Sequence, residues 1–178
     1  MLRVISKMQD LPFRPLTDVY AQSIEDAARQ NYPGREDGLL QAEMDLYSYL
    51  RDVFFKIPGA RLYLWEEAGR ILCALRMEPY KDGMLLTALE THPEYRKMGY
   101  AQKLIQAVLD SMQTPAYSHI RRDNKASISV HQKCGFEKIT NYAVYLDGSV
   151  SQKADTYCRK YVKSSQIVHK HSDKRFHQ

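Results

Sequence analysis

The amino-acid sequence predicts one α/β (α+β) domain built around a mixed sheet, and three observations lead to this prediction. The chain has 178 residues, a length that suits one good-sized domain better than two. Hydrophobic residues make up 44% and charged residues 26% of the chain, as is usual for a soluble globular protein. The apolar pattern changes period along the chain in the order strand, two helices, three strands, helix, strand, helix, two strands, which is typical of helices packed on a sheet.

The first 59 residues predict a short strand and two helices. The strand is "RVIS", close to the N-terminus. After Pro15, these apolar residues recur at helical spacing: Leu16, Tyr20, Ile24, Ala27 and Ala28. The segment "NYPGREDG" breaks the pattern. A second helix is then predicted with one apolar stripe formed by Leu40, Met44, Tyr47, Leu50 and Phe54.

The next segment predicts three consecutive strands. "ARLYLWEEAGRILCALRME" contains two strand-like runs joined by a tight turn from Glu66 to Gly69, which is the pattern of a hairpin. "PYKDG" predicts another turn, and "MLLTALET" a third strand. Its nearly continuous apolar character predicts burial on both faces of the sheet.

The rest of the chain predicts two helices and three strands. The most regular helical pattern is formed by Ala101, Leu104, Ile105, Val108, Leu109 and Met112. "PAYSHIRRDN" predicts a strand that runs into a polar turn, and "KASISVHQKC" a short helix that Gly135 ends. "FEKITNYAVYLDG" and "ADTYCRKYV" predict a final pair of long strands, with the turn between Asp147 and Gln152.

Charge and composition narrow the class of protein. The net charge of +5 favours anionic ligands but does not by itself indicate nucleic acid. Much of it lies in a basic tail over residues 163–178, for which we expect a solvated terminus rather than a metal site, although it contains His169, His171 and His177. No apolar run approaches the ~20 residues that span a bilayer, and the N-terminus lacks a signal-peptide pattern. We therefore expect a cytoplasmic protein without membrane association.

The cysteines predict no metal site. Cys73, Cys134 and Cys158 are widely spaced, and none forms a C-x-x-C pair or a zinc pattern with histidine. Reduced, structural thiols are the expectation.

A basic loop at the start of a helix is the strongest functional signal. It lies within "ETHPEYRKMGYAQKLI", residues 90–105. Unpaired amides and the positive end of the helix dipole can hold a phosphate there, because Gly99 and Ala101 let it approach the backbone. Arg96 and Lys97 add positive charge. Neither a Walker loop nor a dinucleotide fingerprint is present, so the alternatives are a phosphate site and a capped helix with solvated charges.

A second motif, "DNKASISVHQKCGF", follows one strand later. Together the two motifs resemble the GNAT superfamily of acetyl-CoA-dependent N-acetyltransferases. The family's R/Q-x-x-G-x-G/A signature corresponds here to Arg96-Lys97-Met98-Gly99-Tyr100-Ala101. Its later segment corresponds to Asn124, Ser127, His131, Lys133, Gly135 and Phe136. The resemblance implies one domain over residues 1–162, with a variable acceptor-side part (1–59) and a cofactor-binding core (60–162). It also implies a mostly antiparallel sheet with a splayed strand before the cofactor-binding helix.

The resemblance implies acetyl-CoA as co-substrate and gives each matched residue a role. Backbone groups of Leu89 and Thr91 would pair with the pantetheine amides. Amides from Lys97 to Ala101 would hold the pyrophosphate, with Arg96 nearby. Asn124 and Ser127 would line the other arm of the cofactor. The amide of Thr91 would polarise the thioester.

Three side chains are candidates for proton transfer. Glu90 is the first candidate for the general base, because a carboxylate in an apolar strand is costly unless it is paired or functional. His119 is the second candidate and His92, which is expected to be a loop residue, the third. His131 occupies the position of the tyrosine that often serves the family as the acid, and it is interpreted either as that acid or as a packing residue.

Two functions of different classes remain. The first is an enzyme that transfers acetyl from acetyl-CoA to a primary amine of a small molecule or a protein, by direct attack in a ternary complex. The second is a non-catalytic acyl-CoA-binding sensor or scaffold. RNA binding is the weakest alternative, because no clustered aromatic–basic motif is present. Homodimers are common in the family, and the sequence does not decide the oligomeric state.

Overall fold

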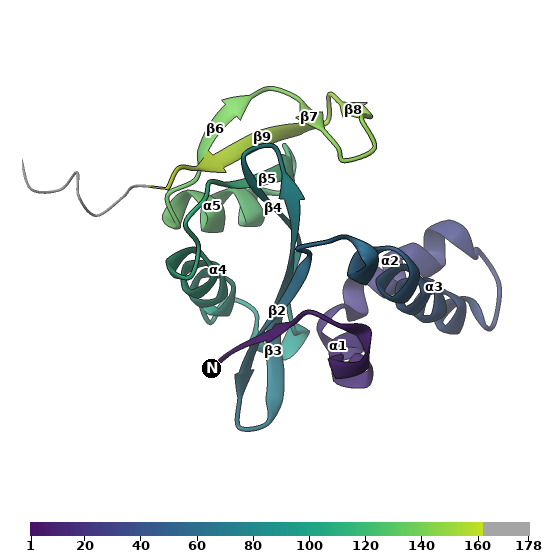
Figure 1. Cartoon of the computed structure of the whole chain (residues 1–178). Coiled ribbons are helices and arrows are strands. Elements are labelled where there is room, and N and C mark those ends of the chain that lie inside the picture. Colours follow the sequence, from purple (N-terminus) through teal and green to yellow (C-terminus); the bar gives the residue numbers. More distant parts are fainter. Residues whose placement is uncertain (162–178) are drawn as a thin grey trace, which may run out of the picture.

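The computed structural model describes residues 1–161 and shows a mixed sheet between two layers of helices (Figure 1). The seven strands of the sheet are arranged in the order β1-β2-β3-β4-β5-β9-β6. Neighbouring strands are antiparallel except β4 and β5, which are parallel. Their bounds are Leu2–Ile5 (β1), Arg61–Glu67 (β2), Arg70–Tyr80 (β3), Gly83–Thr91 (β4), Ala116–Arg121 (β5), Glu137–Thr140 (β6) and Ala154–Arg159 (β9). The predicted α/β fold with a mostly antiparallel sheet is confirmed.

The helices divide between the two faces of the sheet, and each face has its own core. α4 and α5 cover one face, and α1, α2 and α3 lie on the other (Figure 1). Leu75, Leu104 and Val108 belong to the first core, while Leu16, Leu50 and Leu64 belong to the second. The bounds are Phe13–Val19 (α1), Ala21–Asn31 (α2), Gly38–Asp52 (α3), Tyr100–Asp110 (α4) and Lys125–Lys133 (α5), with short 3₁₀ turns at Met8–Asp10, Phe54–Lys56 and Pro93–Tyr95.

The first predicted helix is two helices, α1 and α2. The backbone leaves the helical region at Tyr20, where φ is −89° and ψ is 13°. The Tyr20 hydroxyl donates a hydrogen bond to the carbonyl of Ala88 in β4 at 3.0 Å. This contact across the sheet face fixes the break between α1 and α2 beside β4.

The apolar stripe predicted for the helix α3 is confirmed only at its C-terminal end, where Leu50 and Phe54 are buried. Leu40 and Met44 are 52% and 53% exposed, and Tyr47 is also exposed. In the first half of the helix, Ala42 is buried in place of Leu40 and Met44. Its sequence carries two overlapping stripes with the same helical spacing, and only packing against α2 and the sheet selects between them.

The prediction of one long strand over residues 136–148 was wrong, because the strand is interrupted. β6 pairs with β9 in the main sheet, whereas β7 (Ala143–Val144) pairs with β8 (Val150–Ser151) in a separate two-stranded ribbon. Between them, the carbonyl of Tyr142 accepts a hydrogen bond from the Thr156 hydroxyl at 2.7 Å, outside the strand ladder.

The strand β4 separates from β5 at its C-terminal end, as predicted. The two strands pair only over 84–86. Ala88 has a left-handed φ of 47°, and the register between β3 and β4 shifts beside it, which is the geometry of a bulge. Because the backbone of 89–91 is thus freed on the β5 side, the sheet opens into a gap at its centre.

No helix in the described part of the chain is both long and apolar enough to cross a membrane. Within the same residues no cluster of histidine, cysteine and carboxylate side chains is arranged to hold a metal ion. The three cysteines are buried free thiols. The basic tail over residues 163–178, for which a solvated terminus was predicted, lies outside the described residues together with its three histidines.

Candidate active site

The loop between β4 and α4 presents unpaired backbone amides to an open space. Lys97 and Gly99 both have left-handed φ, 64° and 83°, and Gly99 immediately precedes the first turn of α4. The first helical hydrogen bond runs from the amide of Lys103 to the carbonyl of Gly99. No group in residues 1–161 accepts a hydrogen bond from the amides of 97–102. A Cβ at Gly99 would meet nothing within 4 Å, so the space in front of these amides is free for a ligand.

A cleft of about 700 Å³ extends from this loop between the open end of β4 and the helix α5. It is lined by these predicted cofactor residues: Leu89, Thr91, Arg96, Lys97, Gly99, Tyr100, Ala101, Asn124 and Ser127. Met98, the remaining one, does not line the cleft, and its side chain is 60% exposed. The fold therefore gathers two motifs that are more than twenty residues apart in the sequence onto one surface.

Two polar side chains hold the walls of the cleft in place. The side-chain oxygen of Asn124 accepts a hydrogen bond from the amide of Ser127 at 3.0 Å and so caps α5. Nε of Arg96 donates to the carbonyl of Thr91 at 3.2 Å, tying the loop to the end of β4. Asn124 therefore caps α5 and also lines the cleft, so its position allows both a capping role and a contact with a cofactor.

Glu90 lies in the cleft wall at the open end of β4, facing α2. The Ser23 hydroxyl donates a hydrogen bond to its Oε1. Burial raises the pKa of Glu90 above the ordinary range of a glutamate, against the opposing effects of the Ser23 hydrogen bond and of the positive charge of Arg96. A carboxylate with a raised pKa binds a proton more readily, which suits a general base that operates near neutral pH.

His131 lies in the core beneath the cleft and does not line it. The side chain is 1% exposed, and the ring meets that of Phe136 edge-on at 5.0 Å. Nδ1 lies 2.8 Å from the carbonyl of Ser127, to which it can donate. Nε2 is buried and finds no hydrogen-bond partner in the described part of the chain. Burial lowers the pKa of His131, which keeps the ring neutral. This position favours the packing interpretation over the acid.

We therefore expect His131→Phe to keep turnover within about twofold of the wild type. The variant removes a buried polar atom without a partner, which costs about 1–3 kcal/mol. Because the folded-state pKa of His131 is lowered, its contribution to stability is complete above the unfolded value of about 6.5 and is lost as the pH falls below it. The variant's melting temperature should fall less between pH 7 and pH 5. A tenfold loss of turnover with intact cofactor binding would instead identify His131 as the acid.

The two other predicted histidines are engaged away from the cleft. Nε2 of His119 lies 2.9 Å from the carbonyl of Val144, and Nδ1 lies 3.1 Å from the Thr156 hydroxyl. Burial lowers the pKa of His119. Nδ1 of His92 accepts a hydrogen bond from the amide of Glu94 at 3.3 Å, so His92 is part of the loop structure, as expected. Glu90 is the one predicted base that lines the cleft.

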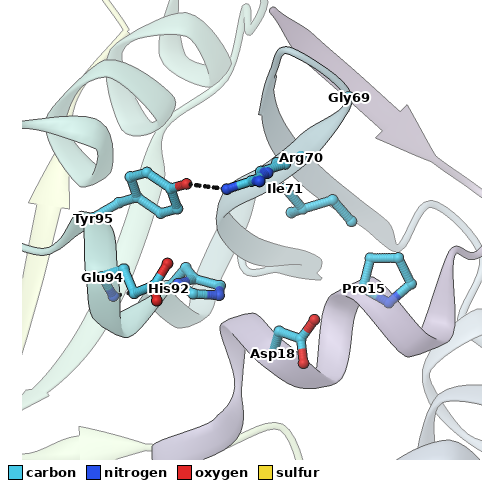
Figure 2. Close-up of a pocket in the computed structure, with 8 residues that line it drawn as sticks. All are labelled: Pro15, Asp18, Gly69, Arg70, Ile71, His92, Glu94 and Tyr95. Atoms are coloured by element: carbon cyan, nitrogen blue, oxygen red, sulfur yellow. Dashed lines mark hydrogen bonds between the residues drawn. The ribbon is translucent and has the colours of Figure 1, made fainter.

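A second, smaller cavity of about 340 Å³ lies beside the cleft, between α1, the β2–β3 turn and the 3₁₀ turn after β4. Figure 2 shows Arg70 reaching the Tyr95 hydroxyl, at 3.0 Å, with the carboxylates of Asp18 and Glu94 further along the wall. Tyr95 separates the two cavities, since it lines both. The wall carries one cation, Arg70, and two carboxylates, Asp18 and Glu94, so its charge defines no single class of ligand.

Sequence reasoning missed the residues that α2 and β3 bring to the site. Tyr20, at the break between α1 and α2, and Ser23 of α2 both contact β4. Arg76 lies on β3 opposite Thr87. The available signal was Arg76 itself, a lone cation in the buried run "ILCALRME". The contacts of Tyr20 and Ser23 with β4 left no local signal.

The cleft thus combines an open parallel pair of strands, an amide-lined helix start and a carboxylate at the open strand end. The sequence model of the acetyltransferase (GNAT) family matches residues 21–136, more than half of the chain. The chain belongs to the GNAT acetyltransferase family. No curated protein sequence matches it.

Solved structures of acetyltransferases share the fold. The PaiA N-acetyltransferase of Thermoplasma acidophilum, solved in complex with coenzyme A, superposes with a TM-score of 0.62 at 13% identity, over 90% of this chain and 99% of that chain. An aminoglycoside 6'-acetyltransferase type Ii gives 0.60 at 10% identity, over 92% and 98%. The ribosomal-protein-S18-alanine N-acetyltransferase of Escherichia coli gives 0.52 at 19% identity, over 89% and 91%. At these identities the likeness is one of fold.

Proposed function

We propose that this protein transfers the acetyl group of acetyl-CoA to a primary amine by direct attack in a ternary complex. The single observation that carries the proposal is the cleft, which joins the unpaired amides at the start of α4 to Glu90 at the open end of β4. One end suits a pyrophosphate, and the other offers a base beside the place where a thioester would lie.

The residues of the cleft fit coenzyme A in chemical type. The amides of 97–102 and the positive end of α4 would hold the pyrophosphate, with the cations of Arg96 and Lys97 beside it. The freed backbone of Leu89 and Thr91 would pair with the pantetheine amides. The coenzyme A structure of the Thermoplasma enzyme, which has the same fold, supports this assignment.

In the proposed reaction a C–N bond to the acceptor forms and the thioester C–S bond breaks. The acceptor nitrogen loses one proton after the attack, which balances the proton that the leaving thiolate takes up. Before the attack, the acceptor ammonium must lose a proton to become the nucleophilic amine. Glu90 takes that proton directly or through water, because its raised pKa matches neutral pH more closely than that of an exposed glutamate. The amide of Thr91 is the proposed donor to the thioester oxygen. We assign no side chain to protonation of the leaving thiolate.

The burial of His131 favours one alternative, a non-catalytic acyl-CoA sensor, because it removes the predicted side-chain acid from the cleft. Such a module would need the amides at the start of α4 but not Glu90. It would bind acetyl-CoA and release no thiol.

The test is to titrate the purified protein with acetyl-CoA by calorimetry and then to add amines by class, following free thiol and the mass of the acetylated product. Saturable binding and thiol release matched by an acetylated amine are the expected results. If acetyl-CoA binds but no thiol is released with any of the amino acids, aminoglycosides, polyamines and peptides added, the result would favour the sensor. If acetyl-CoA does not bind, both functions would be contradicted.

A further inference from the structure

Arg76 is a partly buried cation without an anionic partner on the face of the sheet that carries α1–α3. Its Nε and Nη1 are buried and have no hydrogen-bond partner among residues 1–161. The hydroxyl of Thr87, directly opposite in β4, is buried and unpaired as well. Within residues 1–161 no carboxylate lies within 4 Å of the guanidinium. Because unpaired buried polar groups are costly, these three atoms together point to a missing anionic ligand.

Aromatic rings hold the guanidinium in place. Its carbon lies 4.9 Å from the ring centre of Tyr49 and 5.7 Å from that of Phe54. Glu78, two residues further along β3, is buried but accepts a hydrogen bond from the Tyr49 hydroxyl at 3.3 Å and forms no ion pair with Arg76. A guanidinium stacked on rings keeps its N–H groups available for an anion, and a carboxylate can accept charge-assisted hydrogen bonds from them.

The register of the sheet places Arg76 beside the proposed reaction centre. Ala74 pairs with Glu90 of β4, and Arg76 follows Ala74 by two residues, so the side chains of Arg76 and Glu90 lie on the same face of the sheet. Two residues along a strand span about 6.6 Å. The positive charge of Arg76 opposes the rise in the pKa of Glu90, in agreement with this proximity. Because Arg76 and Glu90 extend from neighbouring strands on one face of the sheet, a ligand whose amine and acid group are separated by a few bonds can contact both.

We propose that the acceptor is a small amino acid whose carboxylate is bound by Arg76 and Thr87 while its amine faces Glu90. The inference rests on the proposed function and names the substrate class of the same site. It commits to a carboxylate within a few bonds of the reacting amine, which polyamines and aminoglycosides lack.

The experiment compares amino acids with the matched amino acid carboxamides as acceptors, in the wild type and in Arg76→Gln. For the wild type we expect kcat/KM to be at least tenfold higher for the acids. In Arg76→Gln this preference should vanish through a higher KM, while acetyl-CoA affinity stays within twofold. Arg51→Gln is the matched control, because Arg51 also lies over a tyrosine ring but is exposed and paired with Asp52. It should keep the preference.

Arg76→Lys keeps the positive charge but lacks the planar guanidinium, so its preference for acids over carboxamides should be intermediate. This variant also keeps the inference testable if Arg76→Gln fails to fold. Equal use of acids and carboxamides by the wild type would overturn the inference while leaving the transferase intact. If no amine releases thiol, the proposed function fails instead, and calorimetry of the coenzyme A-loaded protein with N-acetylglycine and N-acetylglycinamide then decides about Arg76. Heat for the acid alone, lost in Arg76→Gln, would support the carboxylate site, and no heat would overturn it.

Discussion

Gly99→Glu is expected to abolish coenzyme A binding while leaving the protein folded. The side chain would enter the free space in front of the amides of 97–102 and place a negative charge where the pyrophosphate is proposed to lie. We expect the affinity for acetyl-CoA to fall at least about 100-fold, or roughly 2.8 kcal/mol. Calorimetric titration measures this effect directly.

Gly34→Glu is the matched control for backbone strain. Gly34 also has a left-handed φ, 75°, and open space around its Cα, but it lies in the loop between α2 and α3. Both variants pay a similar cost for a side chain at positive φ. Loss of binding in Gly99→Glu alone would therefore be an effect on the site. Normal affinity in Gly99→Glu would remove the loop as the pyrophosphate site.

Glu90→Gln is expected to lower turnover by about 100-fold at neutral pH, a typical contribution of a general base. The affinity for acetyl-CoA should change less than threefold. Because burial raises the pKa of Glu90, the ionised form is disfavoured in the folded state, and stability due to Glu90 declines as the pH rises through that pKa. The neutral glutamine should therefore not lower the melting temperature at pH 7, which separates a catalytic effect from unfolding.

The pH profile gives a second readout for Glu90. A base must be deprotonated, so kcat/KM of the wild type should fall as the pH drops through the raised pKa, with an acidic limb above the ordinary range of glutamate. Glu90→Gln should lack this limb. Glu25→Gln, an exposed carboxylate of α2, should keep both the rate and the limb. Unchanged turnover in Glu90→Gln would mean that Glu90 is not the base and that water accepts the proton.

The sequence predicted the cofactor side of the molecule better than the acceptor side, for a physical reason. The loop before α4 is local: its glycine, its cations and the helix start lie within a few residues, so spacing alone describes its geometry. The two motifs meet in one cleft because β5 lies between them in the chain and beside β4 in the sheet.

The acceptor side depends on contacts that are distant in the sequence. Ser23 reaches Glu90 across 67 positions, and Tyr20 reaches Ala88 across 68. Such contacts have no periodic signal, and the same is true of the choice between the two apolar stripes of α3. For His131, spacing predicted a helix but not the face on which the ring lies, and burial separated the two interpretations.

The most direct test of the central claim is an amide-resolved NMR titration of the protein with coenzyme A. The account predicts the largest shifts at the amides of 97–102, with further shifts at Leu89, Thr91, Asn124 and Ser127, which line the same cleft. Amides of α3 away from the cleft should not move. Saturable binding with its shifts confined to other surfaces, or no shifts at all, would contradict the assignment of this cleft as the coenzyme A site.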